Sequence, residues 1–162
     1  MALGSFLSAR GDVLQTAVRA ANAAGWRLTI AHGSTPLEEL GAVPAGAVVA
    51  RHLPQVAVLQ HTDVFVNHGG NGSVTEAVAA GVPMVVLPFS TDQFAGAAAI
   101  ERAEVGSVLD PNCLTVDSLR SAVEMLLTSG ASERMANAAA ASFLDGGPTR
   151  AARVIAELSP AT

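Results

Sequence analysis

The 162-residue chain contains no lysine and no tyrosine, and charged residues make up only 14% of it. Its positive side-chain charge comes from nine arginines scattered singly along the sequence, and the net charge is −5. Nucleic-acid-binding surfaces usually combine clustered positive charge with aromatic stacking platforms, and aromatic residues form only 4% of this chain. We therefore expect no nucleic-acid partner.

Long hydrophobic runs and paired cysteines are missing as well. No apolar run reaches the roughly 20 residues that a membrane helix needs, and the N-terminus lacks the basic segment and apolar core of a signal peptide. The single cysteine, Cys113, cannot form an internal disulfide, which favours a reducing compartment and a cytoplasmic location. Half of the residues are hydrophobic, so the chain should fold around a core rather than stay disordered.

Metal-binding patterns are also missing. The sequence has no Asp-x-Asp pair or other carboxylate cluster, and no two of its four histidines have a convincing metal-ligand spacing. We therefore expect neither a metal site nor a bound cofactor.

Segments of strand length alternate with segments of helical periodicity along the chain. Strands are predicted at residues 26–31, 47–51, 63–67, 84–87 and 106–109. Helices are predicted at residues 10–24, 54–60, 73–80, 93–104, 116–128, 132–144 and 149–158. This alternation implies an α/β fold, with a Rossmann-like parallel sheet covered by helices on both faces. No interdomain linker is visible, so we expect residues 1–162 to form a single domain.

The first five residues have the pattern of a strand end followed by its glycine turn, with the beginning of the strand missing. A sheet that starts in mid-strand suggests a domain cut from a longer protein. The alternative is that Met1 is a true start and that this strand is merely short.

Three glycines within four positions follow the predicted strand 63–67, in the run His68-Gly69-Gly70-Asn71-Gly72-Ser73. A strand, a glycine loop and a helix in this order leave backbone N–H groups free at the helix N-terminus and let a phosphate approach them. His68 could donate a further hydrogen bond to the same anion. The alternative is a tight turn with His68 as a polar surface residue.

Two polar pairs near this loop also have two interpretations each. Ser73 and Glu76 match a capping box, which would explain both residues locally, or they could contact a phosphate and a ribose hydroxyl. Asp92 could be the N-cap of the next helix, or Asp92 and Gln93 together could bind paired hydroxyls of a sugar. Carboxyl ends of parallel strands share one edge of a sheet, which favours a composite site.

The ordered motifs resemble the donor-binding signature of GT-B glycosyltransferases. These motifs are His-Gly-Gly-x-Gly-Ser-x-x-Glu at 68–76, Ala-Gly-Val-Pro-Met-Val-x-x-Pro at 80–88 and Asp-Gln at 92–93. The chain is most similar to the C-terminal domain of UDP-glycosyltransferase-like enzymes that modify antibiotics and other natural products. Upstream, His52-Leu53-Pro54-Gln55 resembles the family's Trp-x-Pro-Gln nucleobase segment, and Leu3-Gly4-Ser5 resembles its first phosphate-side loop.

The resemblance implies a role for each matching position. Phosphate contacts would come from the first loop and the glycine loop, that is from Ser5, His68, Gly70, Asn71, Gly72 and Ser73. Glu76 would bind the ribose, and Asp92 with Gln93 would bind the transferred sugar. Leu53 and Gln55 would flank the base, and His52 stands where many relatives have the tryptophan that stacks on it. An imidazole offers less stacking area, which leaves the identity of the base open.

The resemblance implies transfer of a hexose or deoxyhexose from a UDP- or dTDP-sugar to a small-molecule natural product, as in antibiotic biosynthesis. Helix dipoles and hydrogen-bond donors would stabilise the leaving diphosphate. The acceptor pocket and its catalytic base belong to an N-terminal domain in that family, so we expect this chain alone to bind donor without transferring sugar. A homodimer through the surface that this domain would cover is one option for assembly.

Two other functions fit parts of the sequence. An NAD-binding Rossmann module would need Gly-x-Gly-x-x-Gly, but Thr75 stands where the third glycine belongs. A stand-alone donor subunit that pairs with a separate acceptor subunit would have much the same sequence as a donor domain.

Overall fold

The computed structural model describes residues 1–4, 9–90, 92–144 and 146–158. Within these residues the strands are β1 (Thr29–Ala31), β2 (Val48–Ala50), β3 (Phe65–Asn67), β4 (Met84–Val86) and β5 (Gly106–Val108). The helices are α1 (Gly11–Ala24), α2 (Gln55–Leu59), α3 (Asn71–Ala80), α4 (Asp92–Arg102), α5 (Val116–Thr128), α6 (Ala131–Leu144) and α7 (Gly147–Leu158). A 3-10 helix, η1 (Leu37–Leu40), was not predicted. Every described strand lies within a predicted range.

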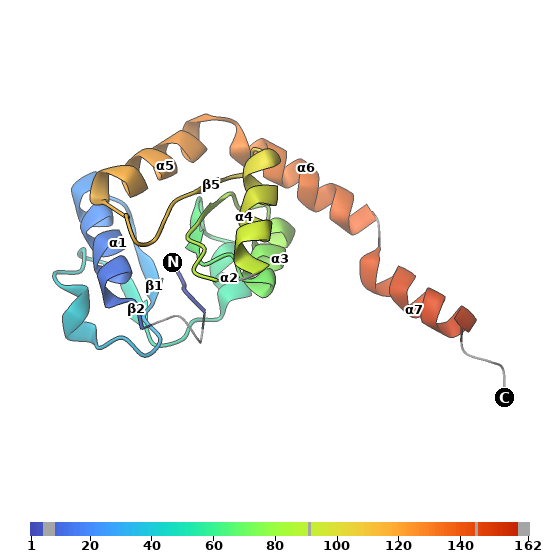
Figure 1. The fold of residues 1–162 in the computed structure, drawn as a ribbon, viewed down its shortest axis with the longest axis horizontal. Helices are drawn as coiled ribbons and strands as arrows, with labels where there is room; N and C mark the ends of the chain where they lie inside the picture. The colour runs from blue at the N-terminus through green and yellow to red at the C-terminus, as the bar shows by residue number, and fades with distance from the viewer. Residues whose placement is uncertain (5–8, 91, 145, 159–162) are drawn as a thin grey trace.

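One parallel sheet runs through the molecule (Figure 1). β1 pairs with β2, β3 pairs with β4, and β4 pairs with β5, all in parallel. Ala2 forms parallel bridges with both Ala31 and Asn67, which joins the two groups in the order β2-β1-Ala2-β3-β4-β5. The first three residues therefore occupy the middle of the sheet.

Helices cover the sheet on both faces, which confirms the predicted fold class. α1 and α5 pack against each other over one face, while α2, α3, α4 and α6 form the layer over the other. Each layer has its own hydrophobic cluster, and alternate residues of β4 point into the two. Val85 packs in the cluster beneath α1 and α5, whereas Met84 and Val86 pack in the cluster with α3, α4 and α6.

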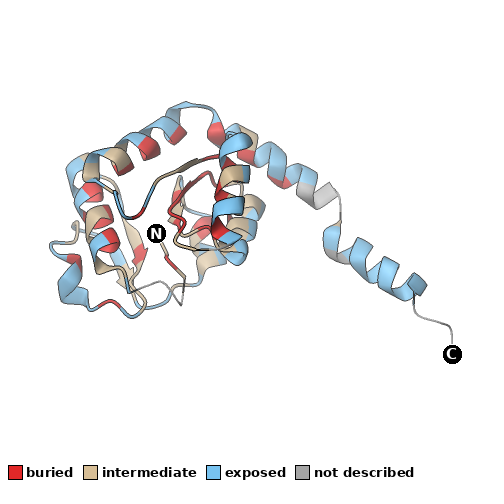
Figure 2. Cartoon of the chain, viewed as in Figure 1, coloured by how far each residue is buried: buried red, intermediate tan, exposed pale blue. Residues whose placement is uncertain are grey.

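The last helix, α7, extends away from this body (Figure 1), and its residues 149–158 are exposed (Figure 2). It begins at Gly147, two residues before the predicted helix 149–158. Among the described residues, no helix has both the length and the apolar character needed to cross a membrane.

β1 and β3 begin later than predicted, by three and two residues respectively. Residues 26–28 and 63–64, which were predicted as the starts of these strands, line one cavity, and no strand of the described chain lies between them. A residue extends a strand only where a neighbouring strand pairs with its backbone N–H and C=O groups. The first residues of these two predicted strands have no such neighbour on the side of the cavity.

Candidate functional site

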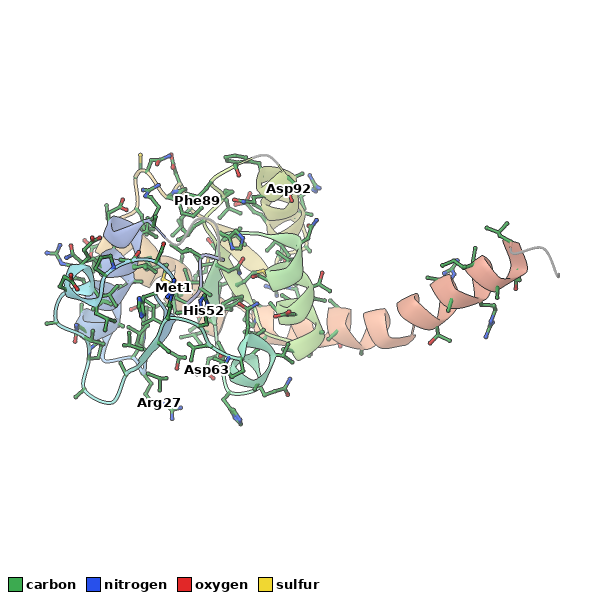
Figure 3. All side chains as sticks on the ribbon, turned by 90° about the horizontal axis from the view of Figure 1, so that it is seen from below. Met1, Arg27, His52, Asp63, Phe89 and Asp92 are labelled. Carbon is green, nitrogen blue, oxygen red and sulfur yellow. The ribbon has the colours of Figure 1, made fainter. Side chains whose placement is uncertain are left out.

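The motifs after β3 and β4 come together at the carboxyl edge of the sheet. Figure 3 shows Asp92 and Phe89 at this edge, with Arg27 and Asp63 at the opposite end of the molecule. The strands are parallel, so the loop after β3, the loop after β4 and the turn at Gly4 all leave the sheet on the same side. The motifs that the sequence predicts to form one composite site therefore lie at the same edge of the sheet.

The loop after β3 turns sharply at Gly69. The buried Asn67 side chain accepts a 2.7 Å hydrogen bond from the Gly69 N–H through Oδ1. Gly69 has a φ of +81°, and a Cβ there would lie 2.8 Å from Cγ1 of Val86. Both the left-handed backbone and the contact with β4 require glycine at this position.

His68 follows β3 with its ring wedged between two glycines. A Cβ on Gly4 would lie 2.7 Å from Cε1 of the ring, and a Cβ on Gly70 would collide with Nε2. Burial lowers the pKa of His68, and the nearby Asp92 carboxylate only partly opposes that shift. The imidazole is therefore neutral at neutral pH, with one N–H to donate. Its Nδ1 is buried and has no hydrogen-bond partner among the described residues.

The helix after the loop begins two residues earlier than predicted. α3 starts at Asn71, with Gly70 as an extended N-cap residue at φ −64° and ψ 139°, and no side chain caps it. Ser73 lies inside the first turn, so the predicted capping box between Ser73 and Glu76 is wrong. The first N–H groups of a helix have no partner within it, and this ten-residue helix leaves them available at the loop. The surface around Gly72 is open, because a Cβ added there would have no atom within 4 Å.

Glu76 bonds to α2 instead of to its own helix. Nε2 of Gln55 donates to Oε2 of Glu76 at 2.8 Å and to Oγ of Ser73 at 3.3 Å. One amide thus holds two of the predicted ligand-binding groups from a segment about 20 residues away. The motif at 52–55 predicts Gln55 beside the base and does not reveal this contact, because no local pattern pairs α2 with α3.

Gln93 and Asp92 differ in exposure at the start of α4. Gln93 is 7% exposed, and its Oε1 accepts from the N–H groups of Phe89 at 2.8 Å and Ser90 at 3.3 Å. Its amide oxygen therefore holds the loop after β4. Its Nε2 donates to Oγ of Ser90 at 3.4 Å, and the second N–H of this amide is the one that a sugar hydroxyl could use. Asp92 is exposed and is the first residue of α4.

The predicted nucleobase segment lies on the loop between β2 and α2. His52 is exposed and Leu53 is half-buried, so the imidazole is accessible for stacking. Figure 3 shows His52 between the edge that carries Asp92 and the opposite side of the molecule, where Asp63 lies. Ser5, the predicted contact from the first phosphate-side loop, lies outside the described residues. Asn71 is exposed at the first position of α3.

Arg10 organises the same edge and was not singled out by any sequence motif. Its guanidinium donates to both carboxylate oxygens of Asp12 at 2.8 Å, to Oδ1 of Asn112 at 3.2 Å and to the Pro111 carbonyl at 3.1 Å. It also lies 5.2 Å from the ring centroid of Phe89. Arg10 therefore ties the segment before α1 to the loops after β4 and β5, over a sequence separation that no local pattern reveals.

Removing the His68 ring should flatten the pH dependence of stability. The pKa of His68 is lower in the folded state than the ordinary value of 6.5, so the unfolded chain takes up the proton first on acidification. Stability should then fall as the pH drops below about 6.5, and His68→Asn should lose this component. Urea unfolding at pH 7 and pH 5 measures the difference.

Other groups contribute to the same pH range, including the buried Met1 ammonium, whose pKa burial lowers to about 5. They are common to both proteins and cancel when His68→Asn is compared with the parent. His61→Asn, at an exposed histidine, is the matched control and should keep the parent's profile. Identical profiles for all three proteins would contradict the buried, neutral state of His68.

No three histidine, cysteine, aspartate or glutamate side chains gather as metal ligands in the part of the chain that the structure describes. The site instead offers one neutral imidazole, an uncapped helix N-terminus and two carboxylates. This set can hold an anion at the helix and hydroxyl groups at Glu76 and Asp92.

Curated proteins of similar sequence are named as glycosyltransferases. The oleandomycin glycosyltransferase of Streptomyces antibioticus is 33% identical over 99% of this chain and 38% of its own length. The NDP-glycosyltransferase YjiC of Bacillus subtilis (strain 168) is 32% identical over 76% of this chain and 32% of its own length. The chain thus spans between about a third and two fifths of the length of these curated relatives.

Solved structures give the same fold over nearly the whole chain. The glycotransferase of kitacinnamycin matches with a TM-score of 0.90 and 35% identity, covering 98% of this chain and 42% of that one. CalG4, the calicheamicin glycosyltransferase, matches with a TM-score of 0.87 and 31% identity, covering 96% and 41%. The sequence profile described as "Erythromycin biosynthesis protein CIII-like, C-terminal domain" matches residues 23–158. The chain therefore belongs to the family of erythromycin biosynthesis protein CIII-like C-terminal domains.

Proposed function

We propose that this chain is the donor-binding domain of a glycosyltransferase that moves a hexose or deoxyhexose from a UDP- or dTDP-sugar to a small-molecule natural product. The observation that carries the proposal is the uncapped N-terminus of α3 beside a neutral His68, with Glu76 held on the same helix by Gln55. The relatives named as glycosyltransferases support it. They do not favour an NAD-binding module or a stand-alone donor subunit.

Each group has a role in the proposed complex. The diphosphate lies at the first turn of α3, against the N–H groups at Gly70, Asn71, Gly72 and Ser73 and the His68 N–H. Glu76 accepts from the ribose, and Asp92 with Nε2 of Gln93 binds the transferred sugar. His52 and Leu53 contact the base, with Gln55 between base and ribose. Ser5 is proposed to complete the phosphate side.

In the transfer step, an acceptor oxygen forms a bond to the anomeric carbon while the bond from that carbon to the diphosphate oxygen breaks. The leaving nucleoside diphosphate keeps the electron pair, and the acceptor proton passes to a base. This chain stabilises the negative charge on the leaving group through the α3 dipole and the donors around it. We propose that the base and the acceptor pocket belong to a second, acceptor-binding domain, and that residues 1–162 form one domain of the two.

Thermal unfolding with added nucleotides tests the proposed ligand. UDP or dTDP at 100 times its Kd should stabilise the folded protein by about 2.7 kcal/mol, which raises Tm by roughly 5–10 °C for a chain of this size. Buffer alone and an equal concentration of NAD are the controls and should leave Tm unchanged. Stabilisation by NAD with no response to either pyrimidine diphosphate would reject the proposal.

The same preparation separates donor binding from transfer. Incubated with a UDP- or dTDP-sugar and an alcohol acceptor, the chain should bind the donor and yield no glycosylated product. Sugar transfer by this chain alone would contradict the location of the base in another domain.

A further inference from the structure

The guanidinium of Arg10 is committed to protein groups rather than to a ligand. A guanidinium carries five N–H groups. Nε and Nη2 donate to the two carboxylate oxygens of Asp12, Nη2 also donates to the Pro111 carbonyl, and Nη1 donates to Oδ1 of Asn112. These hydrogen bonds engage four of the five N–H groups, so the side chain holds segments of the protein together and is poorly placed to bind a phosphate as well.

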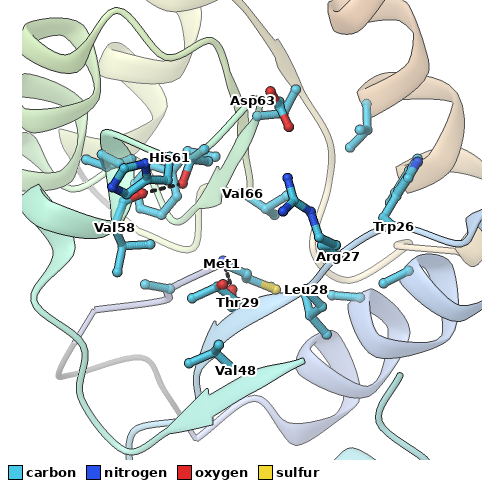
Figure 4. A pocket seen from close by; sticks show the side chains of 18 of the residues that line it. Met1, Trp26, Arg27, Leu28, Thr29, Val48, Val58, His61, Asp63 and Val66 are labelled. Carbon is cyan, nitrogen blue, oxygen red and sulfur yellow. Dashed lines mark hydrogen bonds between the residues drawn. The ribbon is translucent and has the colours of Figure 1, made fainter. Parts of the chain in front are cut away.

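The contacts of Arg10 belong to the donor edge of the sheet. The guanidinium carbon lies 5.2 Å from the ring centroid of Phe89, which Figure 3 shows at the same edge as Asp92. The cavity that Figure 4 shows beside Thr29 and Val66 lies at the other edge, and neither Arg10 nor Phe89 lines it. An effect of Arg10 on a ligand therefore concerns the candidate donor site.

The turn after β5 holds the acceptors that face Arg10. Oδ1 of Asp110 accepts from the Asn112 N–H at 2.8 Å, and the Asp110 carbonyl accepts from the Cys113 N–H at 3.2 Å. Pro111, between them, is buried. These contacts hold the turn independently of Arg10, so it can serve as a fixed support for the guanidinium.

Phe89 connects Arg10 to the groups proposed to bind the sugar. Its ring packs against the guanidinium and against the hydrophobic cluster beneath α1 and α5. The N–H groups of Phe89 and Ser90 donate to Oε1 of Gln93 at 2.8 and 3.3 Å. The orientation of the Gln93 amide, next to Asp92, therefore depends on where the backbone of Phe89 and Ser90 lies.

A lysine at position 10 could not make the same set of contacts. Hydrogen bonding to Asp12 raises the pKa of Arg10 and lowers the pKa of the Asp12 carboxyl, so both groups are charged at neutral pH. The planar guanidinium binds a carboxylate through two parallel hydrogen bonds and stacks on an aromatic ring, whereas an ammonium is a compact point charge. Arg10→Lys therefore keeps the charge and loses the geometry.

We propose that Arg10 is a positioning residue for the sugar part of the donor, acting through Phe89 and the amide of Gln93. This inference rests on the function proposed above. Arg10 fixes the loop after β4, and this loop fixes the amide that holds the transferred sugar. The nucleotide contacts α3 and the segment 52–55 instead, so Arg10 contributes to the preference for a nucleotide sugar over the free nucleotide.

Isothermal titration of Arg10→Lys with UDP, UDP-glucose, dTDP and dTDP-glucose tests the role of Arg10. The affinity for each nucleotide sugar relative to its free nucleotide should fall about five- to tenfold, the effect of losing roughly one hydrogen bond. Arg19→Lys, at an exposed arginine of α1, is the matched control and should keep the parent's ratio. An equal loss for nucleotide and nucleotide sugar in Arg10→Lys, or no loss for either, would overturn the inference.

Amide hydrogen exchange tests the positioning without any ligand. Exchange at Phe89 and Ser90 should become about tenfold faster in Arg10→Lys, because their acceptor on Gln93 is held less firmly. The Leu87 N–H, which donates to the Asn67 carbonyl at 2.8 Å, is the internal control and should exchange as in the parent. Unchanged exchange at Phe89 and Ser90 would contradict the connection from Arg10 to Gln93.

Asn112→Ala provides a milder second variant if Arg10→Lys does not fold. It removes one acceptor of Arg10 at an exposed residue and should lower the same affinity ratio about two- to threefold. A parent chain that binds none of the four ligands would reject the proposed function itself. A parent chain that binds them, with the same ratio in both variants, would reject only the role of Arg10.

Discussion

Replacing Glu76 by glutamine should weaken binding of UDP or dTDP by roughly ten- to a hundredfold. A hydrogen bond to a charged group contributes about 1.5–3 kcal/mol, and each 1.4 kcal/mol corresponds to a factor of ten in Kd. The glutamine can still accept from Nε2 of Gln55, so the contact between α2 and α3 remains. Isothermal titration with each nucleotide measures the loss.

Stability without nucleotide should change little in Glu76→Gln, by less than about 1 kcal/mol. α3 begins at Asn71 and no side chain caps it, so Glu76 has no capping interaction to lose. Glu101→Gln, at an exposed residue near the end of α4, is the matched control for the loss of one negative charge and should leave affinity unchanged. A Glu76→Gln protein that is destabilised but binds nucleotide normally would show a structural role and no ribose contact.

Replacing Gly106 by alanine should destabilise the fold by about 2–3 kcal/mol or more. Gly106 lies in β5 opposite Met84, and a Cβ there would lie 2.5 Å from the Met84 carbonyl oxygen and still closer to Cγ2 of Ile100. The Met84 backbone belongs to the central sheet and cannot shift without disturbing its ladder. Overpacking of this kind costs about 1–3 kcal/mol even where side chains can adjust.

Gly72→Ala is the matched control, since the chemical change is the same. The site is open and helical, and alanine is favoured over glycine in a helix by up to about 1 kcal/mol, so this variant should be as stable as the parent or more so. Urea unfolding of both variants measures the two free energies. A Gly106→Ala protein as stable as Gly72→Ala would refute the close packing of β4 against β5.

The first residues of the chain connect the middle of the sheet to the candidate donor site. Ala2 bridges β1 and β3, and two residues later Gly4 contacts the His68 ring. The strand that separates the two hydrophobic layers thus also carries a wall of the candidate phosphate site. The position of the His68 imidazole therefore depends on how Ala2 and Gly4 are held in the middle of the sheet.

The element pattern was readable from the sequence wherever local signals were strong. α5 has the predicted bounds, because its apolar positions repeat at helical spacing and Thr115 with Ser118 forms a capping box at its start. Residues 84–86 read as a buried strand, because consecutive apolar residues suit a strand that is covered on both faces. Ser73-x-x-Glu76 carries an equally good local signal, yet Gly70 starts the helix earlier and Glu76 turns to α2.

Composition, the alternation of strands with helices, and the order of the motifs from 52 to 93 were enough to predict the fold class and the family, and to expect the motifs at one edge of the sheet. These features are local, or depend on the rule that parallel strands end at one edge. Three contacts depended on packing instead: Gln55 with Glu76, His68 between Gly4 and Gly70, and Arg10 with Asn112. Each joins segments far apart in the chain, and which of them meet depends on how the layers pack across the sheet.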